Sequence, residues 1–398
     1  MFRLGNFFLS AFAIVTTAIP AVGQSFNSTS TGSDGALNLT TPGTIVFNPQ
    51  SFNPPLDPSG NNIFNFTTIN IAAGVTVQLS GQVLTGPVYW LAQGAVTIGG
   101  TISLNGGNGY SCVSPPNPAV RTPSVPGAGG YAGGVGGMTT DTFNDPYQPG
   151  SGPGGGFGGG NAGTAASQGT FTGNRFLVPL IGGSGGTGGL GACGGAGGAG
   201  GGAILIASST SITVTGSITA NAGSGGNPGA GGNQGSLGSG GAIRLAAPLI
   251  QGNGSLSAGP AGVAGIIRLE AFQQNFTGTF PAGTVGLAAP ASVNLPSGGP
   301  PSVSVVSVAG IAIPPNPTGS FTVPDAAINQ STPAAIIIQA ANIPLGTIAT
   351  LYIFSENGPD MTVQTSALTG TLASSTATAS VTFPPGNSRG YVRATWTQ

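Results

Sequence analysis

The chain of 398 residues contains 75 Gly, no His, 7 basic and 8 acidic residues, and its net charge is -1. All seven basic residues are Arg, too few for the clustered cations that bind nucleic acid or anionic lipid. Without His or Lys, a Ser/His/Asp triad, Schiff-base chemistry and a P-loop lysine are also excluded. Apolar residues still make up 39% of the chain, which predicts a packed core rather than charge-driven disorder.

Residues 1–23 are predicted to be a signal peptide. Arg3 precedes an apolar run from Phe7 to Ile19, and the small residue Gly23 lies at the expected cleavage site. The run is shorter than the roughly 20 apolar residues that span a bilayer. We therefore expect an exported protein, extracellular or on the cell surface, with no integral membrane span after cleavage.

After a polar leader at 24–41, short strand-like runs follow one another through residues 42–294. They alternate apolar and polar positions, are bounded by Gly, Pro or Asn, and lack a helical period. The repeated phrases GGAIRLAAP and AGIIRLEA place Ala242 24 residues before Ile266. A repeat of this size predicts an all-β fold, a parallel β-helix whose stacked rungs share one core, rather than an antiparallel sandwich.

Two glycine-rich insertions are predicted, at 106–202 and 223–240. Ala203 precedes Ala242 by 39 residues, and Val88 precedes Ala203 by 115, so both spacings exceed one rung. The inserted tracts could be flexible linkers, or they could pack side by side as extended polyproline-like strands. We favour packed strands because several tracts occur together and the two cysteines would fix their ends.

The chain has two cysteines, Cys112 and Cys193, placed just inside the ends of the larger insertion. In an exported protein they are predicted to form a disulfide that closes the base of that insertion. Closing so long a loop would stabilise the fold by about 4 kcal/mol in the chain-entropy model. Two unpaired thiols are the alternative.

From about residue 300 the glycine content falls and alternating strands return. A Pro/Gly/Ser linker at 295–302 is followed by seven strand-like runs in 303–398, which predicts a small immunoglobulin-like β-sandwich. Tyr391 and Trp396 are expected to help fill its core. The apolar stretch from residue 333 to residue 354 is interrupted by polar residues, Pro and Gly, and is predicted to form two strands rather than a membrane helix.

Few residues are candidates for chemistry, and no cofactor is expected. Asp141, Asn144 and Asp145 lie close together and are weak candidates for a calcium site, although Asp and Asn also favour ordinary turns. Arg244, Arg268 and Glu270 are predicted to point outward from stacked rungs and to form a surface ladder of charges. We expect no catalytic residues.

The phrases GGAILIASSTSITVTGSITANAGSGG and GSGGAIRLAAPLIQGNGSLSA resemble glycine-rich repeat regions of secreted bacterial surface proteins, over roughly residues 203–272. The resemblance implies a β-helical extracellular protein and carries over no catalytic residue. The expected function is structural or adhesive, with an extracellular glycan or a cell-surface component as partner. A carbohydrate-binding or polysaccharide-active β-helix protein is the alternative.

Overall fold

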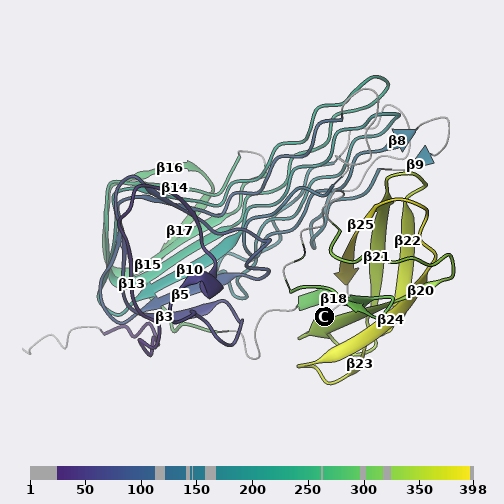
Figure 1. Cartoon of the computed structure of the whole chain (residues 1–398). Coiled ribbons are helices and arrows are strands. Elements are labelled where there is room, and N and C mark those ends of the chain that lie inside the picture. Colours follow the sequence, from purple (N-terminus) through teal and green to yellow (C-terminus); the bar gives the residue numbers. More distant parts are fainter. Residues whose placement is uncertain are drawn as a thin grey trace, which may run out of the picture.

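The computed structural model describes residues 25–112, 122–139, 144–145, 147–156, 167–260, 263–295, 302–315, 317 and 324–394. Within these ranges the regular elements are strands, apart from the 3-10 helix η1 at Pro49–Ser51. The all-β prediction is therefore confirmed, whereas the predicted signal peptide lies outside the described residues. Figure 1 shows a coil of strands, a glycine-rich bundle that extends from it, and a C-terminal pair of antiparallel sheets beside the bundle.

Nine strands of the coil form one sheet in which every pairing is parallel. The pairings of six of them close into a ring, because β3 and β13 are long and each pairs with two shorter strands of that ring. The nine strands are β1 (Gly35–Leu39), β3 (Ile63–Ile71), β5 (Val88–Ala92), β6 (Val96–Ile98), β10 (Ala203–Ser208), β11 (Ser211–Val214), β13 (Ala242–Gly252), β15 (Ile266–Phe276) and β17 (Thr284–Ala288).

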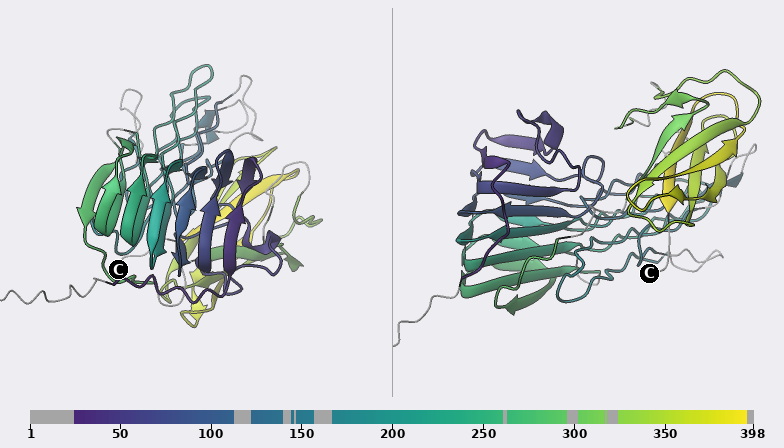
Figure 2. Two further views of the ribbon diagram at one scale, coloured as in Figure 1. Left: turned by 90° about the vertical axis from the view of Figure 1, so that its left-hand side faces the viewer. Right: turned by 90° about the horizontal axis from the view of Figure 1, so that it is seen from below.

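A second parallel sheet has six strands and forms another side of the coil (Figure 2). Gly216 lies between β11 and β12 (Ser217–Thr219), so one turn of the chain contributes to both sheets. The six strands are β2 (Gly43–Val46), β4 (Val75–Gln78), β7 (Thr101–Ser103), β12 (Ser217–Thr219), β14 (Ser255–Ser257) and β16 (Thr279–Ala282).

The core lies between these sheets and is built from columns of apolar side chains. Phe64, Trp90, Ile206, Leu245 and Leu269 occupy matching positions on successive strands, and each is at most 1% exposed. Full burial of one such side chain contributes roughly 1.5–3 kcal/mol. Stacking therefore supplies the apolar contacts that a single turn of the coil lacks.

The predicted register is right for two spacings and wrong for a third. Ala203 pairs with Ala242, and Ala242 with Ile266, as expected. Val88, however, pairs with Ile204 rather than Ala203. A shift of one residue exchanges the two faces of a strand, but β5 and β10 are buried on both faces, so alternation in the sequence does not mark the register.

The segment predicted as a polar leader contributes β1, which pairs with β3 through Asn38 and its neighbours. The C-terminal segment forms two antiparallel sheets around a shared apolar core. The stretch from residue 333 to residue 354 supplies β20 and most of β21, as predicted. These sheets contain β18 (Ser302–Val308), β19 (Ile311–Ala312), β20 (Ala334–Ala341), β23 (Thr369–Gly370) and β24 (Ser375–Val381), and β21 (Ile348–Ser355), β22 (Met361–Ala367) and β25 (Ser388–Ala394).

Within the described ranges, no helix has the length and apolar character needed to cross a membrane. Of the predicted linker at 295–302, residues 296–301 lie outside these ranges.

Candidate functional site

The glycine-rich insertions form a bundle around the buried tract Gly194–Gly202. Every backbone N–H of this tract donates to a carbonyl oxygen of another tract, at 2.7–3.0 Å. The first, fourth and seventh amides donate to residues 131–137, and the second, fifth and eighth to residues 233–239. The third, sixth and ninth donate to residues 104–110. Successive amides thus point in three directions and bind three neighbours.

This threefold period is that of a polyproline-like helix, which has three residues per turn and no hydrogen bonds of its own. Two further tracts, at 183–189 and 223–229, donate to carbonyl oxygens of residues 193–201. The central tract is therefore surrounded by five others, and all of its residues are buried. Packed strands, which the sequence favours over flexible linkers, are confirmed for the described tracts.

Glycine is required in the central tract because neighbouring backbones occupy the space of a side chain. A Cβ built on Gly197 would lie within 3.0 Å of both the carbonyl carbon and oxygen of Gly186, closer than real Cβ atoms approach. Ala196 and Ala199 are the tract's positions with side chains, and both are buried. Ordering a glycine costs roughly 0.5–1 kcal/mol relative to alanine, and one net hydrogen bond, at about 0.5–1.5 kcal/mol, offsets that cost.

The register of the coil continues into the bundle. In the coil, the Thr101 hydroxyl contacts that of Ser217, across a sequence separation of 116. Beyond β7 and β12, three side chains each accept a hydrogen bond, at 2.8–3.0 Å, from the backbone amide of the residue 116 positions later in the sequence. These pairs are Asn105 with Asn221, Asn108 with Ser224, and Ser111 with Asn227. The bundle is therefore a continuation of the coil rather than a separate loop region.

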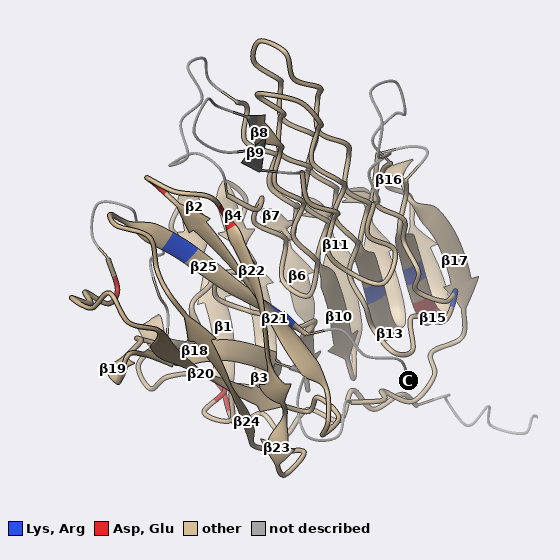
Figure 3. Cartoon of the chain, turned by 90° about the vertical axis from the view of Figure 1, so that its right-hand side faces the viewer, with Lys and Arg blue, Asp and Glu red and all other residues tan. Residues whose placement is uncertain are grey.

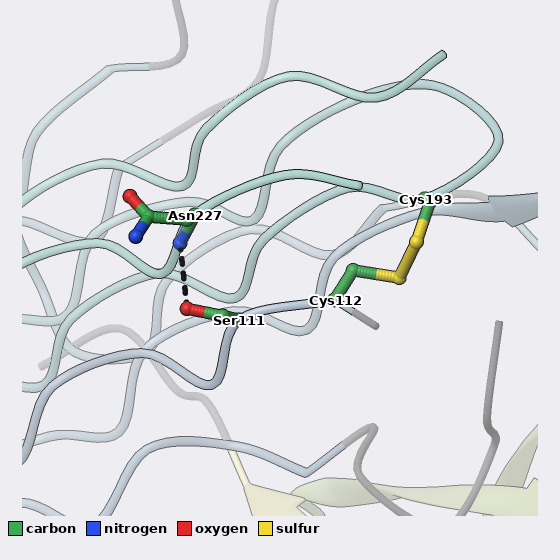
Figure 4. The surroundings of a disulfide bond; sticks show 4 residues. All are labelled: Ser111, Cys112, Cys193 and Asn227. Carbon is green, nitrogen blue, oxygen red and sulfur yellow. Dashed lines mark hydrogen bonds between the residues drawn. A yellow bond between two sulfur atoms is a disulfide. The ribbon is translucent and has the colours of Figure 1, made fainter. Parts of the chain in front are cut away.

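Cys112 and Cys193 form the predicted disulfide, with Cα atoms 5.5 Å apart (Figure 4). Its predicted position at the base of the insertion is wrong. Cys112 ends the tract that leaves β7, and Cys193 precedes the tract that returns to β10, so the bond lies at the end of the bundle distal to the coil. There Cys193 also pairs with Met138 of β8 (Met138–Thr139).

The structure does not test the weak candidates for a calcium site. Asp141 lies outside the described residues, and Asn144 and Asp145 form β9 (Asn144–Asp145), whose side chains are likewise outside them. β9 pairs antiparallel with β8 at the distal end of the bundle. In the part of the chain that the structure describes, no group of three His, Cys, Asp or Glu residues could hold a metal ion.

Arg244, Arg268 and Glu270 form the predicted ladder, but it is not on the surface. Arg244 pairs with Arg268 in register, and Glu270 forms an ion pair with each arginine. The charges gather at β13 and β15 in Figure 3, yet Arg244 is 3% exposed and Glu270 1%. Alternation identified the outward face of the strands, but not that residues distant in the sequence cover it.

A contact between the bundle and the C-terminal sheets was not predicted. The Tyr391 hydroxyl donates to Oε1 of Gln148 at 2.6 Å, and Tyr391 packs with Phe354 against Val135 of the bundle. Burial is the main cause that raises the pKa of Tyr391 well above its ordinary value, and the nearby Tyr352 raises this pKa further. Tyr391 therefore contacts the bundle rather than filling the C-terminal core as expected, and Trp396 lies outside the described residues.

No family model matches the chain, and no curated protein or solved structure is significantly similar to it.

Proposed function

We propose that the chain is a non-enzymatic structural or adhesive protein of the cell surface or extracellular matrix. In this proposal the stacked parallel strands constitute a parallel β-helix, and the C-terminal sheets an immunoglobulin-like sandwich. The observation that carries it is the glycine-rich bundle, in which backbone hydrogen bonds join each central residue to a neighbouring tract. The described interior of this bundle consists largely of backbone and small side chains, which supports a rigid projection.

The dimensions of the bundle suit a spacer that holds a contact surface away from the coil. At about 3.1 Å per residue for a polyproline-like strand, the tract Gly194–Gly202 spans about 28 Å. A flexible glycine linker of the same length would sample many directions, whereas these tracts are joined along their length. The disulfide at the distal end supports export, because such bonds persist in oxidising compartments. We place the adhesive contact at this distal end, with an extracellular glycan or surface component as partner.

Binding of the labelled chain without residues 1–23 to extracellular material from the producing cells tests this function. We expect saturable binding, with no release of sugars from the bound material. Gly197→Val should abolish binding, because its side chain meets the Gly186 backbone and disrupts the bundle. Leu287→Ser changes an exposed residue of β17 at the end of the coil and is the matched control, which should bind as the wild type does.

Hydrogen exchange of the Gly197→Val variant shows whether its bundle has opened while the coil remains folded. Full binding by a variant with an opened bundle would refute the proposed adhesive site. Release of reducing sugars would instead favour a polysaccharide-active protein.

A further inference from the structure

A half-enclosed cavity of about 220 Å³ lies on the outward face of the nine-stranded sheet, against the buried ion pairs. Its floor is formed by Tyr89, Leu205 and Arg244, which occupy matching positions on β5, β10 and β13. The wall is the segment Leu177–Leu180, and Asn294 and Leu295 lie at the exposed rim. Apart from Arg244, Tyr89 and Asn294, the described lining is apolar.

The charges at the floor do not balance. Glu270 Oε2 accepts hydrogen bonds from Arg244 Nη2 at 3.0 Å and from the Ala291 backbone N–H at 3.3 Å. Its other oxygen accepts from Arg268 Nε. Among the described residues, two guanidinium groups thus share one carboxylate whose oxygens are already engaged, which leaves one positive charge in excess.

One nitrogen atom of the Arg244 guanidinium lacks a hydrogen bond within the described part of the chain. Arg244 Nε is buried and has no hydrogen-bond partner among the described residues, although a buried polar group without a partner is costly. No acidic residue is among the described residues that line the cavity. Burial raises the pKa of the neighbouring Tyr89 to about 12, with Arg244 opposing the shift, so at neutral pH the phenol contributes no negative charge either.

We propose that this cavity binds a small aliphatic monocarboxylate, with its carboxylate at Arg244 and its chain against the leucines and Val178. An anion supplies the missing charge and can accept the hydrogen bond of a guanidinium, while the apolar wall favours a hydrocarbon tail. The volume is below the roughly 300–1,000 Å³ of sites for drug-sized molecules, so the ligand has a short chain. This site is separate from the proposed adhesive surface, and each can fail without the other.

Calorimetric titration of the chain lacking residues 1–23 with sodium octanoate tests the site. We expect one octanoate per chain, and at least tenfold weaker binding of octan-1-ol, which lacks the charge, and of acetate, which lacks the tail. Tenfold corresponds to about 1.4 kcal/mol. Equal affinity for octanol and octanoate, equal affinity for acetate and octanoate, or no saturable binding at millimolar octanoate would each overturn the proposal.

Arg244→Met locates the binding. It removes the excess charge and leaves Glu270 paired with Arg268, so we expect octanoate affinity to fall at least tenfold. Arg393→Met, in β25 of the C-terminal sheets, is the matched control and should bind octanoate normally. Unchanged binding by a folded Arg244→Met would exclude this cavity. If that variant does not fold, the comparison of the three ligands on the wild-type chain still decides whether both charge and tail are recognised.

Discussion

Replacement of Gly197 by alanine is expected to lower the free energy of unfolding by about 1–3 kcal/mol, the usual cost of overpacking a closely packed interior. At an unstrained site the same change would stabilise a protein by about 0.4–1 kcal/mol, because alanine restricts the unfolded chain. At Gly197 the clash outweighs that gain, since the new Cβ meets the carbonyl group of Gly186. Only a movement of two hydrogen-bonded tracts could relieve it.

A denaturant titration compares Gly197→Ala with Gly286→Ala. Gly286 lies in β17, and a Cβ there would have its nearest neighbour, Arg268 Nη1, at 3.8 Å. This control should stay within about 0.5 kcal/mol of the wild type, as is usual for substitutions away from packed features. Equal stability of the two variants would contradict the close packing of the Gly186 backbone against Gly197.

Removal of the disulfide, by Cys112→Ala together with Cys193→Ala, is expected to lower the free energy of unfolding by about 2–5 kcal/mol. The upper part of this range applies because the bond closes a long loop, with a sequence separation of 81. Backbone hydrogen bonds of the two residues remain available, for example from the Cys112 N–H to the Asn227 oxygen. The loss therefore comes mainly from the greater freedom of the unfolded chain.

Ser111→Ala is the matched control for the disulfide variant, because it changes the neighbouring residue and removes one hydrogen bond, from the Asn227 amide. Its expected cost is about 0.5–1.5 kcal/mol, and thermal and denaturant unfolding rank the two variants. A double-alanine variant as stable as Ser111→Ala would show that the bond contributes little to holding the bundle.

The strands of the coil could be predicted because side-chain alternation reports directly on burial. The phrases around Arg244 and Arg268 gave the correct register, since both strands carry the same pattern of apolar and charged positions. The pairing of Val88 with Ile204 could not be predicted in this way, because strands buried on both faces have no alternation. The segment of β1 was missed because it reads as polar.

The candidate sites were harder to predict, because they depend on contacts between distant segments. Alternation places Arg244 outside the coil, but the residues from Leu177 to Leu180 that cover it come from a glycine-rich insertion without a periodic pattern. Within the bundle, glycine has no side chain to indicate a partner. The spacing of three between Cys193, which precedes the central tract, and Ala196 and Ala199 within it fits the threefold geometry.

Amide hydrogen exchange of the tract Gly194–Gly202, measured on the folded chain, tests most directly whether the glycine-rich insertions form an ordered bundle. Every amide of this tract is buried and donates to another tract, so we predict slow exchange, comparable with that of the coil strand β10. Exchange at the rate of an unstructured glycine linker would contradict the bundle and the adhesive function proposed for it.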